Sequence, residues 1–102
     1  MAEFAYLARV AKAVTISSTA KAINHADFGF TLDQLERARI ATISAATAGV
    51  RFLYTGEDPT ATFGYLLPAD SIFEIPRNEN VNNLVFIRSG ALDATLTITL
   101  EW

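Results

Sequence analysis

The end of the chain carries the clearest pattern of apolar and polar positions. Over residues 93–102 the apolar side chains Ala, Leu, Ile, Leu and Trp alternate with Thr, Thr, Thr and Glu. A period of two residues is that of a β-strand with one buried face. Threonine on the other face is β-branched and suits an exposed, pleated row. This segment is therefore predicted to be a strand.

Shorter apolar runs, separated by turn-forming residues, continue the pattern toward the start of the chain. Residues 83–88 form one such run, and the Ser-Gly-Ala step over 89–91 leads into the last strand, which predicts a hairpin. Residues 55–62 hold Gly, Asp and Pro and are predicted to be a loop. Further strands are predicted over residues 13–22, 37–46, 50–54, 63–67 and 71–75.

These elements together predict the fold class. Seven or eight short strands at near-regular spacing are typical of a small antiparallel β-sandwich or a jelly-roll-like barrel. A chain of 102 residues fits one domain, so an all-β fold with a single sandwich domain over residues 13–102 is expected. Thr31, followed three residues later by Gln34, matches a capping box and predicts one helical turn at residues 31–36.

The first residues of the chain carry an ambiguous pattern. Within residues 1–12, Phe4 and Leu7 have helical spacing, whereas Phe4, Tyr6 and Val10 alternate as in a strand. Both conformations stay open. In either conformation, this apolar segment is predicted to be an N-terminal arm or edge element that packs on its own sheet or on a neighbouring molecule.

Two further patterns suggest contacts with a partner. Trp102 completes the apolar face of the last strand, and it either covers the edge of the core or anchors an interface, where aromatic side chains are enriched. The Asn-rich segment over residues 77–83 offers amides to a sugar or a protein, although Asn also suits left-handed turn geometry. The predicted partner-binding residues are Phe4, Tyr6, Leu7, Val10, Trp102, Asn78, Asn80 and Asn82.

Composition narrows the classes of partner. The net charge is −3 and the lysines and arginines are dispersed, so direct binding to nucleic acid is not expected. No apolar stretch approaches the roughly 18 residues that a membrane helix needs, so no membrane partner is expected. The first ten residues lack the pattern of a secretory signal. We therefore expect the chain to be made in the cytosol and used there or packed there into a larger assembly.

The inventory of catalytic and metal-binding side chains is thin. His25 is the only imidazole, and beside Asn24 and Asp27 in a predicted turn it is expected to bond the local backbone or to face solvent. The chain has no cysteine, which excludes thiolate nucleophiles, and one histidine excludes the metal cages of cupin-type barrels. The loop with Glu57 and Asp58 offers oxygen ligands to Ca²⁺, but its spacing favours an ordinary turn. No enzymatic activity, cofactor or metal is predicted.

Several segments also carry a resemblance to a known group of proteins. They are the strands around Ile40 and Phe52, then residues 54–60 and 64–70, and finally residues 83–90 leading into the last strand. Their order resembles that of small β-structured virion proteins of tailed bacteriophages and prophages. The resemblance implies a non-enzymatic virion structural protein, assembled in the host cytoplasm. It further implies a homo-oligomer that joins other virion proteins in many copies on the head, neck or tail, with capsid decoration favoured.

A carbohydrate-binding or host-surface recognition module is the alternative function. It would use Tyr54, Tyr65 and the Asn-rich segment, and it predicts an exposed aromatic ring beside a polar groove. Most of the aromatic side chains lie on alternating apolar faces, however, and are predicted to be in the core.

Overall fold

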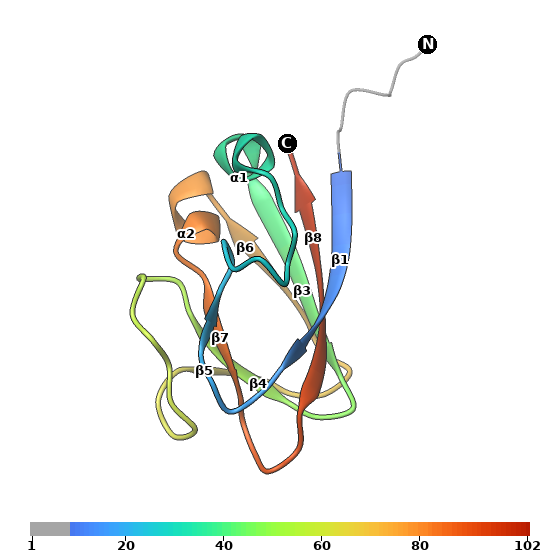
Figure 1. Ribbon diagram of the computed structural model, residues 1–102, viewed down its shortest axis with the longest axis vertical. Helices are drawn as coiled ribbons and strands as arrows, with labels where there is room; N and C mark the ends of the chain where they lie inside the picture. Colours follow the sequence, from blue (N-terminus) through green and yellow to red (C-terminus); the bar gives the residue numbers. More distant parts are fainter. Residues whose placement is uncertain (1–8) are drawn as a thin grey trace.

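The computed structural model describes residues 9–102, which form two antiparallel sheets of four strands each (Figure 1). The first sheet has the order β1-β8-β3-β6, with bounds Arg9–Ile16, Ala94–Glu101, Ile40–Ala46 and Ile72–Pro76. The second sheet has the order β2-β7-β4-β5, with bounds Lys21–Ala22, Val85–Arg88, Val50–Leu53 and Tyr65–Leu67. The prediction of an all-β sandwich is confirmed.

The strand order is that of a jelly roll. The first strand pairs with the last, the second with the seventh, the third with the sixth and the fourth with the fifth. The chain is thus a long antiparallel ribbon that is wrapped into two facing sheets. The sheets do not close into a barrel, so β1 and β6 are the edges of one sheet and β2 and β5 the edges of the other.

The predicted hairpin between residues 83–88 and 93–102 is wrong. The two segments form β7 and β8, which lie in different sheets, and the connection between them crosses from one layer to the other. The turn residues mark where the chain reverses but not which strand pairs with which. β8 pairs instead with β1 and β3 and is therefore a central strand of its sheet. Its apolar side chains are buried.

The start of the sandwich also differs from its predicted bounds. The predicted strand over residues 13–22 is two strands, β1 and β2, separated by a bend at residues 17–20. Because β1 begins at Arg9, residues 9–12 belong to an edge strand of the sandwich, and Val10 is half-buried there against the core. The predicted partner-binding residues Phe4, Tyr6 and Leu7 lie outside the described residues.

Two short helices lie together at one end of the sandwich (Figure 1). Helix α1 (Leu32–Arg37) has the predicted capping box: the Gln34 backbone N–H donates to Thr31 Oγ1 at 3.1 Å, and the Thr31 N–H donates to Gln34 Oε1 at 2.9 Å. Helix α2 (Asn78–Asn82) forms where an Asn-rich loop was predicted.

The core lies between the sheets. It consists of the inward residues of every long strand together with side chains from the connection between β2 and β3, such as Ile23 and Phe28. Phe52 of β4 and Phe86 of β7 are fully buried at its centre, with ring centroids 6.4 Å apart. The ring of Phe28 packs on Phe86 at 5.9 Å, and this aromatic layer extends toward the edge strands β5 and β6.

Candidate docking surface on the edge strands

The most unusual surface of the described chain lies on the edge strands β5 and β6. Seven large apolar side chains are exposed among residues 9–102, and five of them are on or next to these two strands. We call these five residues the aromatic flank: Phe63, Tyr65, Leu66, Ile72 and Phe73. The other two, Leu32 and Leu92, lie on α1 and in the connection between β7 and β8.

Two rings of the aromatic flank occupy positions that face the core. Tyr65 is opposite the buried Phe52 in the β4–β5 pair, and Phe73 is opposite the buried Ile43 in the β3–β6 pair. Both rings contact Phe52, with centroid distances of 5.8 and 5.9 Å. They nevertheless stay 52% and 43% exposed, because β5 and β6 are the last strands of their sheets. The hydrophobic layer of the sandwich therefore reaches the surface here.

The other exposed side chains of these strands lie on the outer faces. Leu66 is opposite Arg51, and Ile72 is opposite Ser44, so each alternates with an inward neighbour. Ile72 is the most exposed member of the aromatic flank, at 66%. Apolar surface thus continues from the inner rings around the edges of both sheets.

Tyr65 is fixed in place by its neighbours. Its ring stacks on that of Tyr54 with centroids 5.6 Å apart and an angle of 10° between the planes. A side-chain hydrogen bond with Tyr65, reinforced by the charge interaction between the two groups and by desolvation, raises the pKa of Tyr54 above its usual value. The contacts with Phe52 and Tyr54 hold the ring in one orientation, so a partner would lose little conformational entropy on meeting it.

The loop between β4 and β5 is held against the sheet by Arg51. Its Nε donates to the Ala61 carbonyl at 2.9 Å, and its Nη1 donates to the Gly64 carbonyl at 2.9 Å. Thr60 and Phe63 close the loop with reciprocal backbone hydrogen bonds. The Arg51 guanidinium thus donates to the backbone of the loop and fixes the position of Phe63 at the surface.

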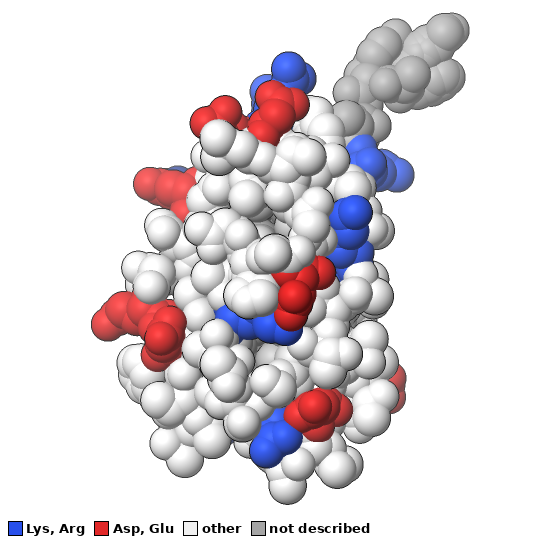
Figure 2. All heavy atoms as spheres, viewed as in Figure 1, with Lys and Arg blue, Asp and Glu red and all other residues white. Residues whose placement is uncertain are grey.

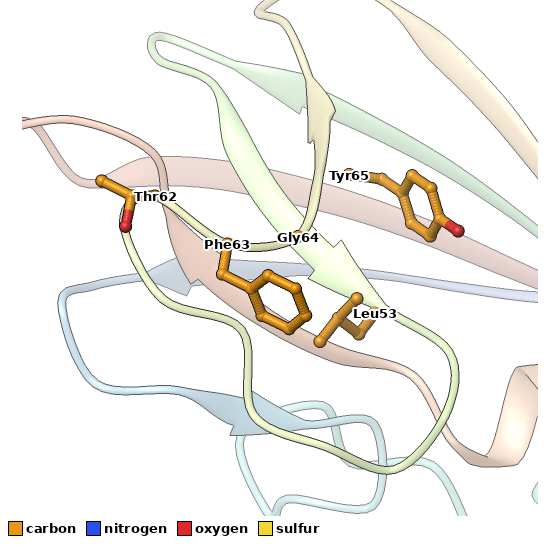
Figure 3. Close-up of a pocket in the computed structure, with 5 residues that line it drawn as sticks. All are labelled: Leu53, Thr62, Phe63, Gly64 and Tyr65. Carbon is orange, nitrogen blue, oxygen red and sulfur yellow. The ribbon is translucent and has the colours of Figure 1, made fainter.

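A shallow hollow of about 350 Å³ lies beside this loop, lined by Leu53, Thr62, Phe63, Gly64 and Tyr65. Figure 3 shows the Leu53 and Phe63 side chains next to each other, with Tyr65 on the other side of Gly64. The walls are mainly apolar side chains. The hollow is therefore suited to an apolar or aromatic group of a partner.

The Asn-rich segment uses its amides within the chain. Asn78 Nδ2 donates to the carbonyls of Leu35 and Ala38 at 2.9 and 2.7 Å, and Asn82 Nδ2 donates to Leu35 at 2.8 Å. Asn80 Nδ2 donates to the Pro76 carbonyl at 3.1 Å. The amides of Asn78 and Asn82 thus join α2 to the end of α1, and that of Asn80 joins it to the end of β6. Contact of Asn78, Asn80 and Asn82 with a partner stays a prediction.

Trp102 follows β8 and is half-buried against the core. This position fits the reading in which it covers the edge of the core, and a contact with a partner stays a prediction. It is not part of the aromatic flank, which lies on other strands.

The polar groups singled out in the sequence form local contacts. His25 Nδ1 accepts a hydrogen bond from the Asp27 N–H at 3.0 Å, as the turn pattern predicted. The hydrogen bond from Lys21 Nζ, 2.6 Å from Asp27 Oδ2, lowers the pKa of that carboxyl group. Glu57 accepts a hydrogen bond from Thr55 within the predicted loop.

Two kinds of feature are absent from the part of the chain that the structure describes. Residues 9–102 contain no group of three His, Cys, Asp or Glu side chains placed to hold a metal ion. No helix in the same range has the length and apolar character needed to cross a membrane.

The sequence patterns missed the aromatic flank. Phe63, Tyr65 and Phe73 belong to the aromatic residues that were predicted to be mostly in the core, yet all three are exposed. The available signal was the pair of short segments with apolar residues on both faces, such as Tyr65–Leu67. A short apolar run is typical of a strand buried on both faces, and only the strand order shows that these two are edges.

Comparisons with protein families, with curated proteins and with solved structures find no match to this chain.

Proposed function

We propose that this protein is a non-enzymatic structural protein that assembles in multiple copies with other proteins, and that the assembly is the head, neck or tail of a bacteriophage virion, with decoration of the head favoured. The aromatic flank is the observation that carries the assembly role. Its five residues together expose about 500 Å², taking about 200 Å² for each whole residue. The largest apolar patch of a typical monomer is about 300–600 Å², and such a patch is often functional.

The distribution of charged side chains favours a partner that is recognised by its shape and by apolar contacts. Figure 2 shows acidic and basic groups scattered over the visible face, with no broad area of one sign. Several charges are also paired with each other, for example Arg9 with Glu101 and Arg88 with Asp93. Long-range steering of a highly charged partner is not expected from such a surface.

The virion setting is supported by two observations of different kinds. One is the resemblance in segment order to small phage virion proteins, from Arg37 onward. The other is the jelly-roll strand order, an architecture that viral capsid domains share with lectin and cupin domains. A fold by itself does not specify a function. Repeated attachment in a particle, however, makes a small interface per copy sufficient.

The test of the proposed function is whether the protein joins particles through the aromatic flank. Ile72→Glu places a charge on the flank at a side chain that is 66% exposed, and Leu92→Glu places the same charge at one that is 65% exposed elsewhere. Mass spectrometry of purified virions should find the wild-type chain and Leu92→Glu in many copies, and Ile72→Glu strongly depleted. Normal incorporation of Ile72→Glu, or virions without the wild-type chain, would rule out the proposal.

The predicted N-terminal arm supplies a second test. Deleting the first dozen residues would remove residues 9–12 of β1, which pair with β8, whereas deleting residues 1–8 leaves every described strand pair in place. We expect the shorter deletion to fold, with an unchanged circular dichroism spectrum, and to be lost from particles. Particles that take up this truncated chain at the wild-type level would show that the segment from Phe4 to Ala8 is not a docking element.

Carbohydrate binding is the second candidate function, and one observation favours it. Tyr65 is half exposed, fixed by Tyr54 and adjacent to the hollow, and such rings stack on sugars. Against it, Leu53 and Phe63 line the hollow, and the amides of the Asn-rich segment donate to the chain's own backbone. A glycan array with wild type and Tyr65→Ala tests this function, which requires binding that the substitution removes.

A further inference from the structure

We propose that the partner of the aromatic flank is a second copy of this chain, joined in a twofold dimer in which the two β6 strands run antiparallel, edge to edge. This inference rests on the proposed assembly function and names the partner of the same surface.

The four sheet edges differ in how they are protected against pairing. β1 carries Arg9 and Lys12, and β2 is two residues long and begins with Lys21. Charged residues, especially lysine, and short length are the usual means of blocking an edge. β6 has five residues without any lysine or arginine; its one charged residue is Glu74, and its one proline, Pro76, is the last residue of the strand. Among the described strands none pairs with the outer edge of β6, so its backbone is available to another strand.

β6 is favoured over β5 as the pairing strand. β5 spans three residues, whereas β6 spans five, so β6 offers more backbone groups to a ladder. The two strands lie on the same flank, because Tyr65 of β5 and Phe73 of β6 both contact Phe52. A copy paired on β6 therefore lies next to β5 as well and covers the hydrophobic layer that reaches the surface there.

The area is sufficient for a specific contact. Two copies of the aromatic flank together expose about 1,000 Å², and a dimer that covers all of it reaches the lower end for a biological interface before any polar rim is counted. A twofold axis brings the same patch of both copies together, so the patch must be complementary to itself. An uncharged set of rings and aliphatic groups meets this condition.

The order of residues in β6 disfavours one register and permits another. With the twofold axis perpendicular to the sheet, inward residues face inward residues and outward residues face outward ones. An axis at Glu74 would oppose two carboxylates, which is destabilising. An axis at Phe73 brings the two half-exposed Phe73 rings together and sets Glu74 of each copy opposite Ile72 of the other. The second register is the one we propose.

The dimer is tested first by its mass. Sedimentation equilibrium of the full chain should show a concentration-dependent dimer. Ile72→Glu would then face Glu74 of the other copy, and we expect its dimerisation to weaken on the order of a hundredfold. Ile72→Lys would face the same carboxylate with an opposite charge, and it should dimerise at least about tenfold more tightly than Ile72→Glu. Leu92→Glu is the control and should dimerise as the wild type does.

Cross-linking tests the register, because the chain contains no cysteine. A mixture of Ile72→Cys and Glu74→Cys chains should form a disulfide-linked dimer under mild oxidation, and either variant alone should form much less. Both positions are exposed and on the outer face, so the core is not disturbed. Equal cross-linking of each variant with itself would overturn the antiparallel register.

The dimer and the assembly function can fail independently of each other. A wild-type chain that stays monomeric at millimolar concentration overturns the dimer. If Ile72→Glu is still depleted from particles in that case, the aromatic flank binds a different virion protein and the assembly function stands. Equal loss of dimer in Ile72→Glu and Ile72→Lys would overturn the pairing opposite Glu74.

Discussion

At the scale of single residues, Gly64 determines how the loop before β5 meets the sheet. Its φ is +133°, a conformation that side chains rarely adopt, and a Cβ there would lie 3.1 Å from Pro59 Cβ and 3.2 Å from the Phe52 carbonyl oxygen. The loop backbone therefore approaches β4 so closely that a Cβ at this position would have to displace its neighbours by a few tenths of an ångström. Phe63 and Tyr65, on either side of Gly64, owe their positions to this approach (Figure 3).

Replacement of two glycines by alanine tests this role. Gly64→Ala should lower the free energy of unfolding by about 2 kcal/mol, because it combines backbone strain with two close contacts. Gly90→Ala is the matched control, since nothing lies within 4 Å of its added Cβ, and it should change stability by about 0.5 kcal/mol or less. Urea denaturation measures both. Equal stability of the two variants would contradict the close approach at Gly64.

At the scale of elements, α2 is stabilised by amides more than by its sequence pattern. Arg77 precedes the helix with φ +75°, and Asn78 donates to three carbonyls at the end of α1, those of Leu35, Glu36 and Ala38. The last carbonyls of a helix have no partner within the helix. The Asn78 amide of α2 therefore supplies the hydrogen-bond donor that the carbonyls at the end of α1 lack.

Alanine substitutions distinguish the Asn78 amide, which bonds to α1, from the Asn80 amide, which does not. Asn78→Ala should lower the free energy of unfolding by about 2 kcal/mol, because it leaves the partly buried Ala38 carbonyl without its donor and removes two further hydrogen bonds to α1. Asn80→Ala removes one exposed hydrogen bond and should cost about 0.5 kcal/mol. Thermal melting followed by circular dichroism gives both values. A cost for Asn80→Ala as large as that for Asn78→Ala would mean that the contact with α1 is not what stabilises α2.

The elements that the sequence predicted well are those whose pattern is local. The alternation in β8 and the capping box of α1 each depend on residues within one short segment, and both are confirmed. The β7–β8 hairpin was wrong because strand pairing depends on residues far apart. The aromatic flank was missed for the same reason: Tyr65 and Phe73 have core-like positions in their own strands, and their exposure follows from the order of strands in two sheets.

At the scale of the whole molecule, the jelly roll is held together by pairing between distant parts of the chain. β1 pairs along its full length with β8, from Arg9 opposite Glu101 to Ile16 opposite Ala94. Folds dominated by such contacts pay the entropy of closing a long loop before the pairing stabilises them. The first sheet therefore forms only when β1 and β8, from the two ends of the domain, have come together.

Folding kinetics test this view with the natural fluorescence of the chain. Trp102 is the only tryptophan and follows β8, half-buried against the core, so its emission reports the closure of the first sheet. Stopped-flow refolding should show this change in milliseconds to seconds, as in other sandwiches of non-local topology. Recovery of the native signal in microseconds would indicate that Trp102 is buried by local structure alone.

The register of β1 and β8 has a consequence for protein engineering. Arg9 lies opposite Glu101, and both are at the end of the sandwich that carries the helices (Figure 1). A short linker from the last strand to the first, with a new opening in the connection at Gly90, would give a circular permutant with the same eight strands and the same neighbours. In that permutant β7 and β8 would no longer be consecutive, so it would show directly that the link between them is a crossing and not part of a pairing unit.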